Sequence, residues 1–321
     1  MYKKTFGKKD LKEILSYYDL GGFKTCSKIP KGENINIQIQ TTKGRYHLKY
    51  FIQEKSERKN WLLYELLLTD YLSQRGIKVP TIIRTNDGSL YTKYKGRFCV
   101  IYKVIEGSVN YPLNQITVSQ VGAFLGKFHR VIEGYKPRYR TTRGRFTPRT
   151  LYQILIKEAL PKYRNEKLKQ EILKKSKFIY RMRYSNLPKG PIHMDIDHQN
   201  FIFKNNKLQA LIDFGDSLYG ILLIDIARGA YEFCLNSGIA FNHRLLNVFL
   251  QKYQKYRPLT LEEKRAFVDF MKFTYIWKIT DLIKNKLPDS QIRKRLEMFE
   301  RIPEELSNVF QFSIRPYSEH S

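Results

Sequence analysis

Paired cysteines and long apolar segments are both missing from this sequence of 321 residues. Its three cysteines, Cys26, Cys99 and Cys234, are far apart and in no C-x-x-C spacing, which argues against a disulfide framework and a thiolate zinc site. The most apolar stretch, residues 218–230, is short and contains charged residues, and the first ten residues have no apolar core, so no secretory leader or membrane-spanning helix is predicted. These absences predict a folded cytoplasmic protein with reduced thiols.

Acidic residues are scarce relative to basic ones. The 58 Lys and Arg against 30 Asp and Glu give a formal net charge of +28, which creates a positive field that attracts phosphate groups. The densest basic stretch, residues 136–149, alternates Lys and Arg with aromatic residues, a composition that can bind nucleic acid or acidic lipid headgroups. Because basic residues are spread over the whole chain, we favour a solvated linker there over an anionic partner.

The character of the sequence changes near residue 107. Its 42% hydrophobic and 14% aromatic residues can supply a full core. Apolar alternation predicts a hairpin with its turn at Lys43-Gly44, and helical periodicity from residue 114 onward predicts helices almost everywhere except in 192–215. We therefore predict an α+β fold with a strand-rich lobe over 1–107 and a mainly helical lobe over 108–321. The first lobe also contains a predicted helix over 58–76 and predicted strands over 79–85, 89–94 and 97–105.

Polar side chains gather in the segment I-H-M-D-I-D-H-Q-N at 192–200. Three residues in this segment, His193, Asp197 and His198, could in principle bind zinc. Catalytic zinc helices favour the spacing H-x-x-x-H, however, and these histidines lie among apolar residues that need burial. A zinc site is therefore not favoured.

Oxygen ligands for a hard cation are available in and after the same segment. Mg²⁺ needs one or two carboxylate or carbonyl oxygens besides phosphates and water, and Asn200 and Asp213 supply such a pair. Residues 201–212 are long enough for a hairpin that returns Asp213 to Asn200. Asp195 then remains to face an attacking hydroxyl group.

The order of these residues resembles a known family. D-x-x-x-x-N followed by D-F-G has the spacing of the catalytic and metal loops of protein-kinase-like enzymes. H-x-D-x-x-x-x-N at 193–200 with I-D-F-G-D at 212–216 resembles the aminoglycoside phosphotransferase and choline kinase branch of that fold. The resemblance implies a two-lobed protein-kinase-like fold that uses ATP and Mg²⁺, with Asp195 as the base and Asn200 and Asp213 as metal ligands.

The first lobe carries further parts of the same resemblance. Gly32-Glu33-Asn34 resembles the turn that covers the phosphates, Lys49 resembles the strand lysine, and Glu65 resembles its helix partner. V-I-E-G-S-V-N, which contains Glu106, resembles the connection whose backbone faces adenine. The resemblance thus assigns Gly32, Asn34, Lys49, Glu65 and Glu106 to nucleotide binding. Strand alternation alone leaves open which face of the strand Lys49 occupies.

Within that branch the sequence is most similar to type II homoserine kinases and to related spore-coat kinase-like proteins. The similar segments are 32–36, 41–48, 187–203, 211–214, 223–234 and 253–267. This similarity implies homoserine or a similar amino alcohol as the acceptor. Choline, an aminoglycoside, methylthioribose or a sugar is the alternative acceptor, and a spore-coat-type protein with weak or no catalysis is the alternative outside catalysis. Met194 stands where the branch usually has glycine.

Four residues near these motifs have less defined roles. Asp197 and Asp216 could each bind an ammonium group of the acceptor, or could belong to a solvated loop or to the surroundings of magnesium. His193 is predicted to brace the catalytic loop rather than to carry a proton. Asp225 is predicted to be a buried, hydrogen-bonded carboxylate.

Overall fold

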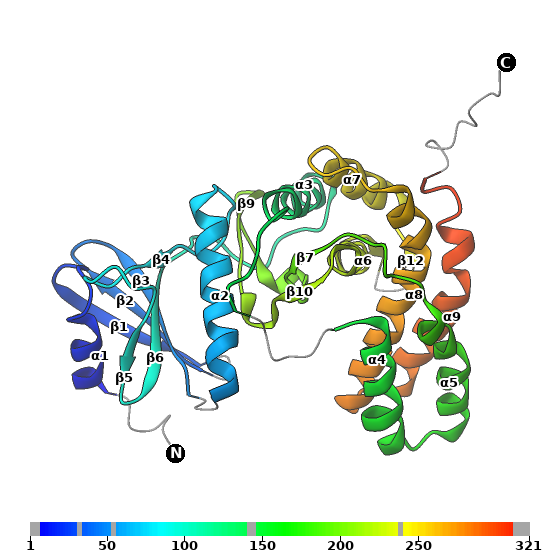
Figure 1. The fold of residues 1–321 in the computed structure, drawn as a ribbon, viewed down its shortest axis with the longest axis horizontal. Coiled ribbons are helices and arrows are strands. Elements are labelled where there is room, and N and C mark those ends of the chain that lie inside the picture. The colour runs from blue at the N-terminus through cyan, green and yellow to red at the C-terminus, as the bar shows by residue number, and fades with distance from the viewer. Residues whose placement is uncertain (1–6, 31–33, 53–55, 140–145, 237–239, 311–321) are drawn as a thin grey trace. The chain divides into compact units, whose positions relative to one another are not determined.

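The computed structural model describes residues 7–30, 34–52, 56–139, 146–236 and 240–310 (Figure 1). These residues pack into two compact units. The first unit comprises the described residues of Met1–Asn110, Pro137–Thr142 and Phe201–Gly215, and the second those of Tyr111–Lys136, Arg143–Asn200 and Asp216–Ser321. The middle of the basic stretch at 136–149 lies outside the described residues.

An antiparallel sheet forms the centre of the first unit. The register pairs Gln40 with Arg45, so the hairpin predicted around Lys43-Gly44 is confirmed. The predicted strand over 79–85 is reduced to two residues, Ile82–Ile83. The strands lie in the order β1 (Phe23–Ile29), β2 (Ile35–Thr41), β3 (Arg45–Tyr50), β6 (Arg97–Lys103) and β4 (Ile82–Ile83), with β5 (Thr92–Tyr94) also paired to β6.

Two helices, α1 (Lys8–Leu15) and α2 (Ser56–Gln74), pack against this sheet (Figure 1). One apolar cluster joins Leu11 of α1 to Leu48 of β3, and a separate cluster joins Leu66 of α2 to Val100 of β6. Since successive side chains of a strand point to opposite faces, Lys49 must lie opposite Leu48, on the face that α2 covers. The packing thus decides a question that alternation in the sequence left open.

The hairpin β8 (Phe201–Lys204) and β9 (Lys207–Leu211) also belongs to the first unit. Its antiparallel pairing confirms the hairpin predicted between Asn200 and Asp213. The backbone N–H of Leu211 donates to the carbonyl of Lys78 at 2.9 Å, and Lys78 Nζ donates to the carbonyl of Leu208 at 2.6 Å. These bonds attach the hairpin to the chain that follows α2.

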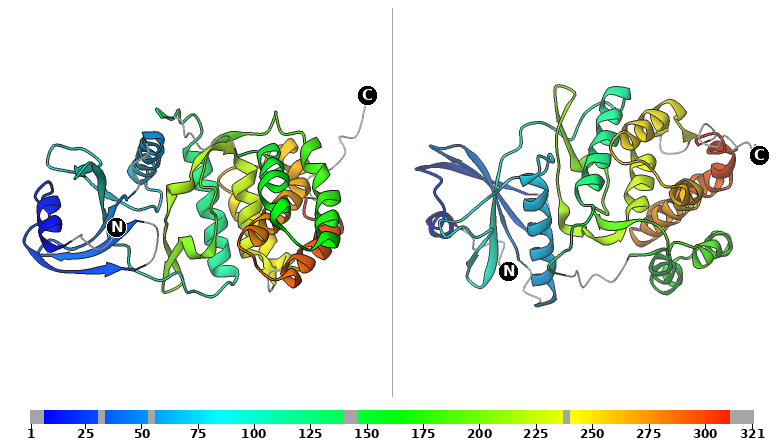
Figure 2. Two further views of the ribbon diagram at one scale, coloured as in Figure 1. Left: turned by 90° about the horizontal axis from the view of Figure 1, so that it is seen from below. Right: turned by 45° about the horizontal axis from the view of Figure 1, so that its top comes forward.

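The second unit is mainly helical. Helices α3 (Gln115–Val131) and α7 (His243–Gln254) lie side by side (Figures 1 and 2). Gly122 and Gly126 of α3 allow this close approach, because a Cβ atom at either would collide with backbone atoms of α7. The helices are α3 (Gln115–Val131), α4 (Pro148–Ile154), α5 (Glu166–Arg181), α6 (Leu222–Phe233), α7 (His243–Gln254), α8 (Leu261–Lys284) and α9 (Asp289–Glu305), and a π-helical turn (Leu155–Ala159) and a 3₁₀ turn (Leu160–Lys162) extend α4.

Two pairs of short strands complete the second unit. Strand β7 (Lys189–Ile192) pairs antiparallel with β10 (Leu218–Ile221), so the chain that leaves β7 and the chain that enters β10 lie at the same edge. A second pair consists of β11 (Leu235–Asn236) and β12 (Ala240–Phe241). No helix within the described ranges is both long and apolar enough to cross a membrane. A strand-rich N-terminal region and a helical C-terminal region confirm the predicted α+β class.

Candidate active site

In the first unit, Lys49 is held between two carboxylates. Its Nζ lies 3.3 Å from Glu65 Oε1 and 3.9 Å from Asp213 Oδ1. The side chains of Lys49 and Glu65 are only 18% and 11% exposed. Burial opposes the charge on Lys49, but the carboxylates of Glu65 and Asp213 outweigh it and raise the pKa of Lys49 above its usual value. The ammonium group therefore stays charged and is suited to hold phosphate oxygens.

Asp213 follows β9 directly and combines a fixed backbone with an exposed side chain. Its φ of +65° is in the left-handed region, which aspartate tolerates better than most residues. The side chain is 61% exposed even though it lies beside Lys49. A solvent-accessible carboxylate of this kind is a suitable ligand for a hard cation.

The other residues that resemblance assigned to the nucleotide have varied surroundings. Gly32 lies outside the described residues. Asn34 Oδ1 accepts a hydrogen bond from the backbone N–H of Ile52 at 3.4 Å. Glu106 is exposed and pairs with Lys204 and with Arg45, and these two cations lower the pKa of Glu106 below its usual range. Only its backbone is thus left for the predicted contact with adenine.

In the second unit, hydrogen bonds within one loop hold the predicted catalytic residue. Asn200 Nδ2 donates to the carbonyl of Asp195 at 2.9 Å and to its carboxylate Oδ2 at 2.8 Å. The backbone N–H of Asn200 donates to the carbonyl of Asp197 at 3.0 Å. The Asp195 side chain remains 44% exposed. The loop therefore orients this carboxylate while leaving it accessible to a substrate.

A buried carboxylate anchors the same loop from behind. Asp225, which is fully buried in α6, accepts the backbone N–H groups of His193 at 2.7 Å and Met194 at 2.9 Å. Met194 has a φ of +71°, a conformation in which glycine would be unstrained. The hydrogen bond from the backbone N–H of Met194 to Asp225 helps to hold methionine in this conformation. The neighbouring side chain of His193 is buried.

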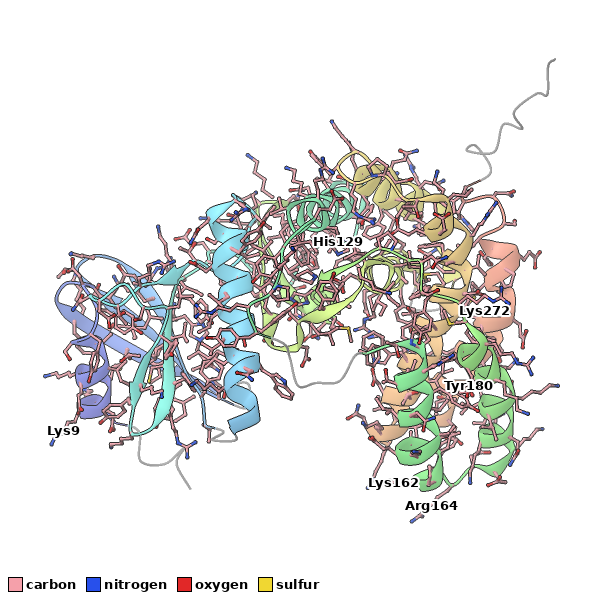
Figure 3. The ribbon with its side chains drawn as sticks, viewed as in Figure 1. Lys9, His129, Lys162, Arg164, Tyr180 and Lys272 are labelled. Carbon is pink, nitrogen blue, oxygen red and sulfur yellow. The ribbon has the colours of Figure 1, made fainter. Side chains whose placement is uncertain are left out.

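His129 of α3, labelled in Figure 3, extends this buried network. Its Nε2 lies 3.5 Å from Asp225, and its Nδ1 lies 2.8 Å from the hydroxyl of Tyr253 on α7. Burial lowers the pKa of His129 below its usual value. A neutral ring can donate from one nitrogen to the carboxylate while the other accepts the hydroxyl proton. The network thus ties α3, α6 and α7 to the chain immediately before Asp195.

Arg228 of α6 contacts Asp195 but was not among the predicted site residues. Its Nη2 lies 3.4 Å from Asp195 Oδ1, its Nη1 lies 3.6 Å from Glu232, and its guanidinium lies 4.6 Å from the ring centre of Trp277. The residue is only 3% exposed. A buried guanidinium requires partners. An arginine within the apolar segment 222–231 could therefore have indicated from the sequence that a charged partner lies nearby.

The two acids with undefined roles occupy different surroundings. Asp197 Oδ1 accepts the backbone N–H of Gln199 at 3.0 Å and lies 3.1 Å from His198 Nδ1, so Asp197 supports the turn of the loop. These two side chains also approach Glu232, but Glu232 is paired with Lys278, and we therefore assign no metal to them. Asp216, by contrast, lines a cavity beside Asp195.

This cavity lies wholly in the second unit and has a volume of about 510 Å³. Its walls come from α4 and the turn after it, from the chain following β7, from the chain entering β10, and from α8. The rings of Phe146 and Trp277 lie 4.6 Å apart in this wall. The lining residues are Phe146, Thr150, Gln153, Ile154, Lys157, Glu158, Met194, Asp195, Asp216, Leu218 and Trp277.

The chemistry of the donor atoms fits a hard divalent cation. Asn200 Nδ2 donates both of its hydrogen bonds to Asp195. The amide oxygen of Asn200 is therefore directed away from Asp195 and can bind a ligand. Asp213 adds an accessible carboxylate. Mg²⁺ prefers such oxygen donors and normally completes its coordination with phosphate and water. Asp213 belongs to the first compact unit and Asn200 to the second, so a metal ion bound by both residues stays a prediction.

The two units together contain the groups of a kinase-like phosphotransferase, and comparison with known proteins names the family. Residues 25–259 match the phosphotransferase enzyme family, and the chain belongs to it. It is 28% identical over 261 residues to the homoserine kinase of Janthinobacterium sp. (strain Marseille), which covers 80% of each protein.

Solved structures share the fold. An amicoumacin kinase in complex with AMP-PNP and Ca²⁺ superposes with a TM-score of 0.72 at 18% identity, covering 97% of this chain and 99% of that one. A microcompartment-associated aminopropanol kinase superposes with a TM-score of 0.65 at 13% identity, covering 94% and 98%. The fold is therefore the protein-kinase-like fold of small-molecule kinases, as the sequence predicted.

Proposed function

We propose that this protein transfers the γ-phosphoryl group of ATP to a hydroxyl group of a small amino alcohol, a class of acceptors that includes homoserine. The observation that carries the proposal is the Asp195 carboxylate, which Asn200 orients and which lines a cavity large enough for a small molecule. The similarity to proteins named homoserine kinase supports the acceptor class.

In the proposed reaction, the acceptor hydroxyl oxygen attacks the γ-phosphorus, the bond from that phosphorus to the bridging oxygen of ADP breaks, and the hydroxyl proton passes to Asp195. Lys49 would hold phosphate oxygens, with Glu65 fixing its position. Asn200 and Asp213 would bind Mg²⁺, which neutralises phosphate charge when bound. Catalysis in such enzymes consists mainly of positioning and charge stabilisation.

The ion pairs around Lys49 support an enzyme rather than a catalytically inactive relative. A scaffold has no need for a nearly buried lysine between two carboxylates, since burying charges is costly. In this chain the lysine, its helix partner and the accessible Asp213 occur together in the first unit.

A screen of ATP consumption tests the proposal. Purified protein with Mg²⁺ is offered amino alcohols that include homoserine, together with aminoglycosides, choline and sugars, and the Asp195→Asn variant is assayed in parallel. We expect ADP formation that depends on an amino alcohol and is strongly reduced in the variant. Turnover only with a sugar, or turnover unaffected by the substitution, would contradict the proposal.

A further inference from the structure

The cavity beside Asp195 has a composition that selects among amino alcohols, and this inference rests on the proposed function. We propose that the acceptor is an amine-bearing alcohol with an apolar, aromatic-sized body. Homoserine has the amine and the hydroxyl group but lacks the apolar body. The cavity volume and the nature of its walls favour the first kind of molecule.

The volume and walls of the cavity match a partly apolar ligand. About 510 Å³ falls within the range of roughly 300–1,000 Å³ typical of sites for ligands much larger than homoserine. Apolar side chains from four separate segments form much of the wall. Because removing apolar surface from water is the main source of affinity in such sites, a small polar acceptor would leave this wall unused. The apolar wall residues are Phe146, Ile154, Met194, Leu218 and Trp277.

Trp277 is suited to contact the apolar body rather than the amine. Aromatic faces can bind cations, but the guanidinium of Arg228 already lies 4.6 Å from the ring centre of Trp277. A second cation at this ring would be repelled by the first. Phe146, whose ring centre lies 4.6 Å from that of Trp277, extends the apolar surface, and an aromatic ligand could pack against both.

An acid in the wall provides a contact for the amine of the acceptor. Three carboxylates line the cavity, Asp195, Asp216 and Glu158, together with one lysine, Lys157. Glu158 is paired with Lys284 at 3.3 Å, and Arg228 lies 3.4 Å from Asp195 Oδ1. Asp195 is assigned to the hydroxyl group, so we assign the amine to Asp216, where an ammonium group would be stabilised by the opposite charge.

Tryptophan fluorescence allows binding to be measured without turnover. The chain has two tryptophans, Trp61 on α2 of the first unit and Trp277 in the cavity wall, so a Trp61→Phe variant of the full chain makes Trp277 the sole reporter. This variant is titrated with phenylalaninol, with aminopropanol and with homoserine. Aminopropanol has the amine and hydroxyl groups without carboxylate or ring. We expect phenylalaninol to bind at least roughly tenfold more tightly than either of the others, the gain typical of burying one phenyl group.

A pair of matched substitutions in the same background tests whether the wall is responsible. Phe146→Ala should weaken phenylalaninol binding roughly fivefold, with little effect on aminopropanol. Phe178→Ala is the control, because Phe178 on α5 packs against Phe299 at 5.6 Å and does not line the cavity. Equal or tighter binding of homoserine or aminopropanol, no response to phenylalaninol, or equal effects of the two substitutions would each overturn the inference.

Failure of this inference can be distinguished from failure of the proposed function. Phosphorylation of homoserine by a protein whose Trp277 does not respond to phenylalaninol would contradict the inference alone. Binding of phenylalaninol at Trp277 without consumption of ATP on any acceptor would support the binding chemistry and contradict the proposed reaction.

Discussion

The two compact units build their parts of the proposed machinery in different ways. In the first unit, the ammonium group of Lys49 lies within 4 Å of the carboxylates of both Glu65 and Asp213. In the second unit, Asp195 stands at the wall of a cavity formed largely by apolar and aromatic side chains. The first arrangement suits phosphates and a metal, which need charge, and the second suits an acceptor, which must be selected by shape and by a few polar groups.

The difference extends to how each charged group is held. Lys49 is stabilised by carboxylates that outweigh its burial, so its position depends on ion pairs. Asp195 is oriented by an amide and by the backbone around it, and that backbone is bonded to the buried Asp225. The hydrogen bonds from Asn200 to Asp195, at 2.8 and 2.9 Å, are shorter than the contacts of Lys49, at 3.3 and 3.9 Å, and short hydrogen bonds fix direction more firmly. A base that must accept one particular proton benefits from the second kind of support.

The largest effect is expected from removing the base in the second unit. Asp195→Asn should lower kcat by roughly 10²–10⁴-fold, the range typical of general-base catalysis. Binding of Mg-ATP, which we assign to Lys49, Asn200 and Asp213, should change little. Steady-state kinetics and titration calorimetry would measure the two effects. Near-normal turnover in this variant would remove Asp195 from its proposed role.

Removing the Asp213 carboxylate from the first unit should weaken the binding of the nucleotide and leave the acceptor cavity intact. Asp213→Ala removes an accessible carboxylate beside Lys49, so Mg²⁺-dependent affinity for a non-hydrolysable ATP analogue should fall by at least roughly tenfold. Affinity measured with the metal chelated should change much less, which provides the internal control. Calorimetry that finds the same gain from Mg²⁺ in both proteins would count against Asp213 as a metal ligand.

A pair of conservative substitutions tests which spare acid recognises the acceptor amine. Asp216 lines the cavity and Asp197 supports the loop. Asp216→Asn should therefore raise the acceptor KM roughly tenfold, as expected for losing one member of a charge pair, with the ATP KM nearly unchanged. Asp197→Asn is the matched control with a smaller effect. The assignment fails if the control has the larger effect on the acceptor KM.

The last expected effect concerns the stability of the first unit and leaves the proposed reaction unchanged. Burial and the neighbouring charge of Lys49 lower the pKa of His47 to about 4, below its unfolded value. Below pH 6.5 the unfolded chain gains a proton at this residue that the folded unit does not, so stability should fall as the pH drops from 6.5 toward 4, by at most about 1.4 kcal/mol per pH unit.

His47→Gln provides the comparison for this pH dependence. Urea unfolding followed through Trp61 in the Trp277→Phe background, at several pH values between 4.5 and 7.5, would report on the first unit. We expect the variant to lose less stability than the parent over the acid part of this range. Parallel curves for the two proteins would show that His47 does not contribute.

Some features of the site could be predicted because they are local in the sequence. Asp195 and Asn200 lie in one short loop, and their spacing suffices to bring an amide to a carboxylate. The hairpin after Asn200 follows from apolar alternation around Asn205-Asn206, both of which adopt positive φ. The face occupied by Lys49 could not be predicted, because helices cover both faces of the sheet and alternation separates the faces without saying which helix covers each.

The sequence by itself determined the class of protein, since motif order and spacing are properties of the chain. Only the tertiary structure decided what the acceptor cavity is made of. Its wall joins Phe146, Met194, Asp216 and Trp277, and the guanidinium of Arg228 connects Trp277 to Asp195. Periodicity shows that such residues are buried, but the side chains they meet depend on how helices distant in the sequence pack together.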